Sequence, residues 1–356
     1  MTDQTNDRLV RNGTQRIGYI DALRGFTMFL VVLNHIAALC WQLTSDTPSF
    51  HYYLTQVRMP MFFFISGFVL YKEGVIWNGK QVVSFFKKKI PVQLLSPLLF
   101  FIIYLHFTGT SLYDGFIDKQ KCGYWFTFVL LEYYVFYAAV KFFVRSRWAS
   151  WILAAMGIAM YSFCWPTMTV HHQTTDNALA LISAHQWRFF LFFVLGTFVR
   201  QHYDIVQQWL DNKWTLLVCI AFFFLVNAFR DVLPVKTVIM KGMLAVTGLV
   251  IMFSFFRSKQ ALFSRETKIG RTMQYVGRRT LDIYLIHFFL LPRHLSEFTF
   301  FSDHPMPVIE FFVSSAIAIM VIAICLIISN IFRLSPRLAH FLFGAKPKTG
   351  EQRAET

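Results

Sequence analysis

The chain has little charge for its length. Only 15% of its 356 residues are Asp, Glu, Lys or Arg, whereas soluble proteins carry about 25%. Hydrophobic residues make up 56% of the chain and aromatic residues 18%. This composition excludes a chain made mainly of water-soluble domains and indicates a membrane protein with little soluble mass.

The chain also has few cysteines and no familiar metal motif. It contains no CxxC, HxxxH or HExxH sequence among its five cysteines and 11 histidines, so we expect no metal site. Cys40, Cys122 and Cys164 fall near the predicted outer face, where one disulfide is possible. Cys219 and Cys325 lie within apolar runs, where cysteines more often remain packed thiols.

Repeats and low-complexity linkers are not visible either, and we expect no cleavable signal peptide. The first apolar run is too long for a signal peptide and lacks a small-x-small cleavage site. We therefore expect any chemistry to lie inside one helical domain. The predicted organisation is a cytoplasmic N-terminal segment (1–16), a transmembrane domain (17–332) and a basic cytoplasmic tail (333–356).

Ten apolar runs approach the roughly 17–25 residues that a transmembrane helix needs. The third and sixth are short for full spans. The predicted fold is an all-α integral membrane protein, a bundle of about ten transmembrane helices. The ten runs cover residues 17–40, 57–74, 92–107, 123–144, 148–166, 186–200, 214–230, 235–256, 275–292 and 306–332.

Positive charge alternates with these runs. With the N-terminus inside, 26 of the 34 Lys and Arg residues fall on the cytoplasmic side and eight fall outside. Because cytoplasmic loops favour positive charge, both termini are predicted to be cytoplasmic in a multi-pass plasma (inner) membrane protein. The net charge of +15 is then mainly an orientation signal, and we expect no nucleic-acid partner.

The first run, "DALRGFTMFLVVLNHI", contains Asp21, Arg24 and His35. Polar residues at membrane depth usually face a bundle interior. Arg24 and His35 are 11 residues apart, so they share a helix face about 16 Å apart, and Asp21 lies one turn before Arg24. We interpret the three as one functional stripe. The alternative is that Asp21 and Arg24 form a rim anchor while His35 bonds a neighbouring carbonyl.

Basic residues mark the next two runs. Arg58 stands at the outer end of "RMPMFFFISGFVLYK", where it is either an interfacial anchor or a ligand contact. Lys87, Lys88 and Lys89 precede the third run on the cytosolic side. They either enforce topology or bind a phosphate-rich ligand.

Further polar residues lie in later runs. Glu132 is near mid-depth in the fourth run and needs a partner there. Arg188 stands at the outer end of the sixth, where the alternative is an interfacial anchor beside Trp187. Tyr284 and His287 are one turn apart in the ninth, and His287, like His35, lies in an outer half. We take these residues, with Arg58, as candidates for an acceptor site or pathway.

Five segments, in order, resemble motifs of the acyltransferase 3 family of integral membrane acyltransferases. "LRGFTMFLVVLNH" is similar to its Arg-x10-His signature and "RMPMFFFISGF" to its second-helix segment. "KKK" before "LLSP" stands where the family commonly has Arg-x-x-Arg, so we take the lysines as a positive rim. "YWFTFVLL" and "VGRRTLDIYLIH" resemble two later helices. The likeness covers nearly all of the helical part and is strongest to standalone carbohydrate O-acetylases without a fused esterase-like domain.

This resemblance implies an enzyme with no permanently bound cofactor. Its donor substrate would be cytosolic acyl-CoA, usually acetyl-CoA, and its acceptor a hydroxyl of a cell-surface glycan. His35 would act as a general base or carry the acyl group briefly. Arg24, held by Asp21, would complete the catalytic group and, with lysines 87–89, would meet the CoA phosphates. Tyr284 and His287 would orient the acceptor.

Other functions also fit part of the pattern. In a transporter, Asp21, Arg24, His35 and Glu132 would line a proton or substrate path, although two related halves are not visible. A structural scaffold explains neither the polar stripe nor the motif order. The sequence leaves the acceptor open among O-antigen, capsule, exopolysaccharide and other outer hydroxyl compounds. It leaves the acyl chain and the oligomeric state open too.

Overall fold

The computed structural model describes residues 17–43, 49–146, 148–164, 173–229, 237–297 and 300–344, and every regular element in these ranges is helical. The longer helices are α2 (Gly18–Leu39), α3 (His51–Leu70), α4 (Gly79–Ile90), α5 (Ser96–Thr108), α7 (Trp125–Phe143), α8 (Trp148–Cys164), α10 (Phe190–Gln201), α12 (Lys213–Ala228), α13 (Thr237–Ser258), α14 (Lys268–Arg278), α15 (Thr280–Leu290) and α17 (Pro307–Phe332). Shorter helices are α6 (Leu112–Ile117), α9 (Gln173–Leu181), α11 (Tyr203–Leu210), α16 (Phe300–Asp303) and α18 (Pro336–Phe343). One π-helical turn, η1 (Pro91–Leu95), and three 3₁₀ turns, η2 (Lys121–Gly123), η4 (Ala184–Phe189) and η5 (Arg293–Glu297), complete the described elements.

The prediction of a helical multi-pass membrane protein is confirmed for the described residues. Each of the ten predicted runs contains a helix, and six helical segments are long and apolar enough to cross a membrane. A bent pair, η4–α10 with α11 at 99°, passes the same test together, whereas α8, α12 and α15 are shorter apolar helices. The count of ten spans and the cytoplasmic side of the termini stay predictions.

Two predicted boundaries are wrong. The third run was expected to begin at residue 92, but α4, η1 and α5 form one helical segment of 30 residues from Gly79 to Thr108. Pro91 interrupts the regular hydrogen bonding there, since proline has no N–H, and Ser96 Oγ donates to its carbonyl at 3.0 Å. The ninth run is likewise two helices, α14 and α15, that meet at Arg279.

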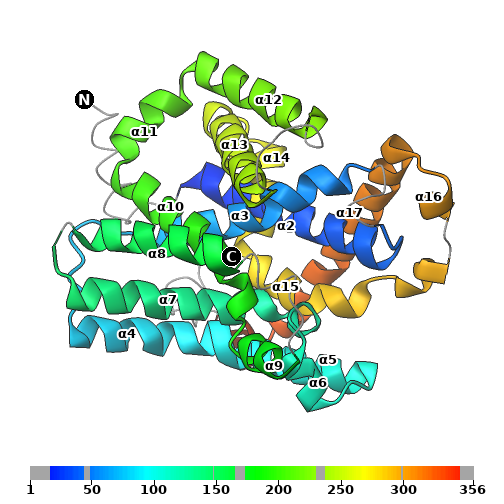
Figure 1. Ribbon diagram of the computed structural model, residues 1–356. Coiled ribbons are helices and arrows are strands. Elements are labelled where there is room, and N and C mark those ends of the chain that lie inside the picture. The colour runs from blue at the N-terminus through cyan, green and yellow to red at the C-terminus, as the bar shows by residue number, and fades with distance from the viewer. Residues whose placement is uncertain are drawn as a thin grey trace.

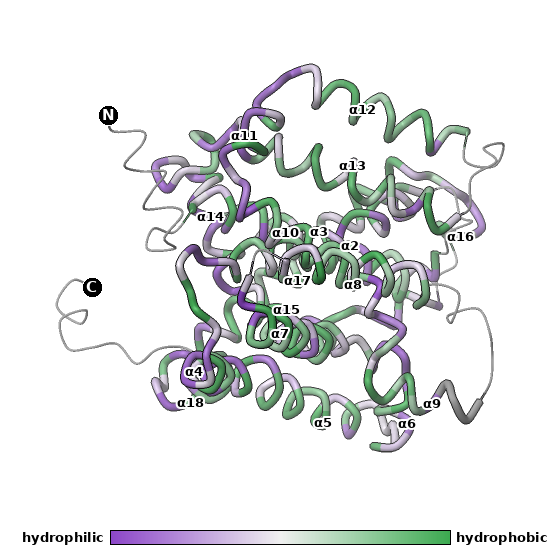
Figure 2. The backbone as a smooth tube through the Cα atoms, turned by 60° about the vertical axis from the view of Figure 1, so that its left-hand side comes forward, coloured by the Kyte–Doolittle hydropathy of each residue, from purple (hydrophilic) through white to green (hydrophobic). Residues whose placement is uncertain are grey.

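The helices are apolar in their middles and polar at their ends. Figure 2 shows hydrophilic backbone gathered at α4, α11, α14 and α18 on one side of the molecule, whereas α6, α9 and α16 lie on the opposite side. In Figure 1, α2 and α3 lie in the middle, between α11–α13 and the group of α4, α5 and α7. The two central helices therefore form the inner walls of the bundle.

Glycines bring α2 and α14 into backbone contact. A Cβ atom on Gly25 would overlap the carbonyl of Met273, and one on Gly277 would overlap the carbonyl of Asp21. Small residues allow this close approach of membrane helices. Residues 21–25 of α2 meet residues 273–277 of α14 at this contact, and further along α2 the ring of His35 meets that of His287 in α15.

A second glycine contact joins α3 to α10. A Cβ atom on Gly67 would overlap the carbonyl of Phe193, and one on Gly196 would overlap that of Phe64. These helices are parallel, because the Phe63 ring lies 5.5 Å from that of Phe189. The contact holds the second half of α3 beside η4 and α10.

A buried carboxylate joins α15 to α17. Asp282 is 2% exposed and accepts hydrogen bonds from Arg333 at 2.9 and 3.0 Å, from Arg279 at 3.3 Å and from Ser329. Arg279 also donates to Ser329 Oγ at 3.0 Å. This network, which we call the Asp282 clasp, anchors the last long helix.

Candidate functional site

One cavity of about 570 Å³ lies among the central helices. Arg24, Met28, Val31 and His35 line its α2 wall at spacings of four, three and four residues, which is one face of a helix. Arg24 and His35 therefore share a face, as the sequence predicts. Since they lie about 16 Å apart along the axis, the cavity follows roughly half of a hydrocarbon core of ~30 Å.

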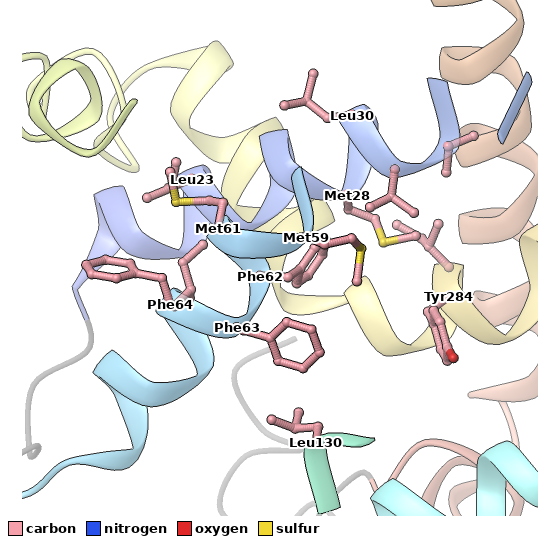
Figure 3. Packing of buried hydrophobic residues seen from close by; sticks show 14 of the residues in the cluster. Leu23, Met28, Leu30, Met59, Met61, Phe62, Phe63, Phe64, Leu130 and Tyr284 are labelled. Atoms are coloured by element: carbon pink, nitrogen blue, oxygen red, sulfur yellow. The ribbon is translucent and has the colours of Figure 1, made fainter. Parts of the chain in front are cut away.

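Apolar side chains from several helices form the middle of this cavity. Figure 3 shows Met28 from α2, Met59 and Phe62 from α3, Leu130 from α7 and Tyr284 from α15, all of which line it. Most ligand sites combine such an apolar wall with a few placed polar groups.

The end of the cavity near the start of α2 carries three cations. Arg24 from α2, Lys89 from α4 and Arg278 from α14 line it, together with Thr280 and Phe343. If the predicted orientation holds, this inner end faces the cytosol. No Asp or Glu side chain is among the described residues that line the cavity at either end.

The opposite end carries three more cations. Arg58 from α3, Arg188 from η4 and Lys241 from α13 line it, with the amides of Gln56 and Gln186. The Arg188 guanidinium lies 4.8 Å from the centre of the Phe189 ring. We call this the outer end, and it includes the neighbourhood of His35.

The loop at the outer end is held by a buried lysine. Lys121 is 3% exposed, and its Nζ donates to the carbonyls of Phe116 at 2.9 Å and Ala180 at 2.8 Å. Burial lowers the pKa of this amine, while the charges of Glu132 and Asp118 oppose that shift. These two hydrogen bonds join η2 to α6 and α9. Gln120 and Gly123, on either side of Lys121, line the cavity.

His35 is half-buried on the cavity wall. Its ring lies 5.4 Å from the ring of His287 and 4.9 Å from that of Phe288. In the described part of the chain, no group hydrogen-bonds the His35 imidazole, so the alternative of a simple carbonyl bond finds no support. An imidazole that faces a cavity in this way can accept a proton from a bound hydroxyl.

Tyr284 and His287 take different positions. Tyr284 lines the cavity, and its hydroxyl donates to Gly123 O at 3.3 Å. His287 is fully buried behind His35, with Nδ1 2.9 Å from the carbonyl oxygen of Tyr284 and 3.0 Å from that of Ile283. We therefore place Tyr284 among candidates for direct contact with a ligand, and His287 behind the wall.

The three predicted lysines do not act as one cluster. Lys89 lines the cavity, with Nζ 4.8 Å from the centre of the Tyr134 ring, whereas Lys87 and Lys88 line a separate surface groove. The reason is that α4 continues as a helix through all three, so consecutive residues point about 100° apart.

Asp21 and Glu132 lie off the cavity wall. Asp21 is buried and is not among the residues that line the cavity, whereas Arg24 and His35 are. Its three-residue offset from Arg24 is about 300°, less than a full turn. Its support of Arg24 stays a prediction. Glu132 accepts a 2.6 Å hydrogen bond from Trp187 Nε1, which supplies the partner that a carboxylate needs there.

Sequence reasoning missed several residues of the site. Lys241 and Arg278 line the cavity although each resembles an ordinary rim cation in the sequence. The neighbouring Gly277 could have indicated that Arg278 lies near the site, because this glycine brings α14 against α2. Gln56 and Gln186 carry no sequence signal of their own. All five cysteines are free thiols.

These features define a class: a multi-pass membrane protein with a cation-lined cavity and a histidine on its wall. The acyltransferase 3 family model, which describes an acyltransferase domain, matches residues 17–330. The chain belongs to this family, and the predicted membership is confirmed. No characterised protein and no solved structure matches the chain significantly.

Proposed function

We propose that this acyltransferase moves an acyl group, with acetyl as the expected group, from cytosolic acyl-CoA to a hydroxyl of an extracytoplasmic carbohydrate. The observation that carries the proposal is the single cavity that has Arg24 near one end and His35 towards the other. A donor that enters from one side and an acceptor from the other can meet there. The enzyme would act in the plasma membrane on a glycan of the cell envelope.

The inner end suits the donor. Arg24, Lys89 and Arg278 offer three positive groups to the phosphates of CoA, and cations form strong hydrogen bonds with phosphate oxygens. The apolar middle, with Met28, accommodates the less polar pantetheine arm. The thioester would then approach His35.

At His35 the transfer needs one proton acceptor. The acceptor hydroxyl oxygen attacks the thioester carbonyl carbon while the imidazole takes the hydroxyl proton. Collapse of the tetrahedral intermediate breaks the carbon–sulfur bond, and the thiolate of CoA recovers the proton from the imidazolium. The products are an ester and free CoA. A brief acyl-imidazole on His35 is the variant of this route.

Proteoliposomes test the function directly. Purified protein is reconstituted with acetyl-CoA labelled in the acetyl group inside and a glycan acceptor outside. We expect label to appear on the outer glycan only when the protein is present. Flux of a solute or protons without labelled glycan would instead indicate the transporter alternative. Comparison of cell-surface glycans by mass, with and without the gene, identifies the acceptor.

The lysines provide a matched pair for the donor end. Replacement of Lys89 with Ala is expected to raise the KM for acetyl-CoA about tenfold, since one charge-assisted hydrogen bond is lost. Lys88→Ala on the other face should leave the KM within about twofold. Steady-state kinetics at varied acetyl-CoA measures both. Equal effects of the two substitutions would mean that the cluster acts only through its overall charge.

A further inference from the structure

The donor accounts for the cations at only one end of the cavity. Arg58, Arg188 and Lys241 lie at the outer end, where a neutral sugar would need none of them. Three positive groups that line a cavity without a carboxylate in its described wall favour a negatively charged ligand.

We propose that the acceptor is an anionic saccharide, whose acid group binds at Arg58, Arg188 and Lys241 while one of its hydroxyls faces His35. This inference rests on the proposed function, and it names the chemical class of the acceptor. The shared chemistry is a carboxylate or a phosphate carried on a sugar.

Arg58 gives the clearest support. It lines the cavity, and no hydrogen bond or ion pair joins it to any other described residue. Its Nε lies in a buried position. Arg58 is also close enough to His35 for the two to interact electrostatically. A carboxylate or phosphate bound to this guanidinium would satisfy Nε and place the rest of the sugar near the imidazole.

Two buried amides that line the same cavity as Arg58 supply acceptors for sugar hydroxyls. Gln56 is 9% exposed and Gln186 is 3% exposed, and both line the cavity. Gln56 donates its amide N–H to Asn227 Oδ1 at 3.2 Å. Its own Oε1 accepts no hydrogen bond in the described chain. Gln186 Oε1 also lacks one there. Buried acceptors of this kind are costly unless a ligand donates to them.

Aromatic rings complete the outer end. Trp125 and Phe189 line the cavity with their rings stacked, 5.9 Å apart and 21° from parallel. Such a flat apolar surface suits one face of a sugar ring, with the polar groups at its edge. Cations, orphan acceptors and an aromatic surface together match a sugar that carries both an acid and hydroxyls.

A pair of simple sugars tests the proposal. Methyl glucuronide and methyl glucoside differ only in a carboxylate against a hydroxymethyl group. We expect the glucuronide to raise the thermal-unfolding midpoint of the purified protein and to accept acetyl from acetyl-CoA. The glucoside should do neither at the same concentration. Glucose 6-phosphate is the third probe, and it distinguishes phosphate from carboxylate recognition.

Substitutions locate the binding. Arg58→Gln is expected to weaken the glucuronide response at least tenfold, while Arg271→Gln, an exposed arginine of α14, should leave it unchanged. If Arg58→Gln fails to fold, Lys241→Gln tests the same end. Preference for succinyl-CoA over acetyl-CoA that disappears in Arg58→Gln would assign the cations to the acyl group and overturn the proposal.

The two hypotheses fail differently. Equal responses to the glucoside and the glucuronide, including no response to either up to the solubility limit, would overturn the anionic acceptor. Transfer of acetyl to both sugars at equal rates would overturn the anionic acceptor but would support the acyltransferase function. Binding of the glucuronide alone, with no transfer to any glycan, contradicts the proposed function and supports the anionic site.

Discussion

His35→Ala is expected to lower the rate of acyl transfer by about 10²–10⁴-fold, which is the typical contribution of a positioned general base. The imidazole is half-buried on the cavity wall, and no described group hydrogen-bonds it. Removal of the ring therefore takes away the proton acceptor and leaves the wall otherwise intact. Initial rates in proteoliposomes measure the loss.

Expression and folding need a control in this experiment. His106→Ala changes an exposed histidine of α5 and should retain the full rate. His35→Gln keeps a polar side chain of similar size but cannot act as a base near neutral pH, so it should be as inactive as the alanine variant. Wild-type activity in a well-folded His35→Ala protein would rule out the proposed role.

Of the substitutions considered for stability, loss of the Asp282 clasp should have the largest effect. We expect Asp282→Ala to lower the free energy of unfolding by about 3–5 kcal/mol, since removal of one partner leaves buried groups uncompensated. Arg279, Ser329 and Arg333 all lose their shared acceptor. Chemical denaturation in mixed micelles, followed by tryptophan fluorescence, gives the difference from the parent protein.

An exposed ion pair provides the comparison. Asp211, 52% exposed, accepts from Arg257 at 2.8 and 2.9 Å. Asp211→Ala should cost at most about 1 kcal/mol, because water screens exposed pairs. If the two alanine substitutions cost the same, burial does not strengthen the clasp.

Most of the fold follows from local properties of the sequence. Apolar length predicts where helices lie, and every predicted run contains one. Helical arithmetic also places Arg24 and His35 on one face, and both line the cavity. These inferences succeed because they depend on the chain within a single helix.

Features that depend on another helix could not be predicted. Trp187, 55 residues from Glu132 along the chain, supplies the bond to this carboxylate. Lys89 faces the cavity and Lys88 does not, which depends on where α4 begins and how η1 continues it. Lys241 becomes part of the site only because α13 packs beside α3. Long-range packing decides each of these cases.

The glycine contact between α2 and α14 is the point about which a tilt of α2 would move His35 relative to His287. His35 lies ten residues beyond Gly25, which is about 15 Å along α2. A tilt of about 4° at the contact would therefore displace His35 by ~1 Å, a misplacement that can cost catalysis about 100-fold. The close contact that Gly25 and Gly277 allow therefore determines the position of the His35 imidazole, about three helical turns away.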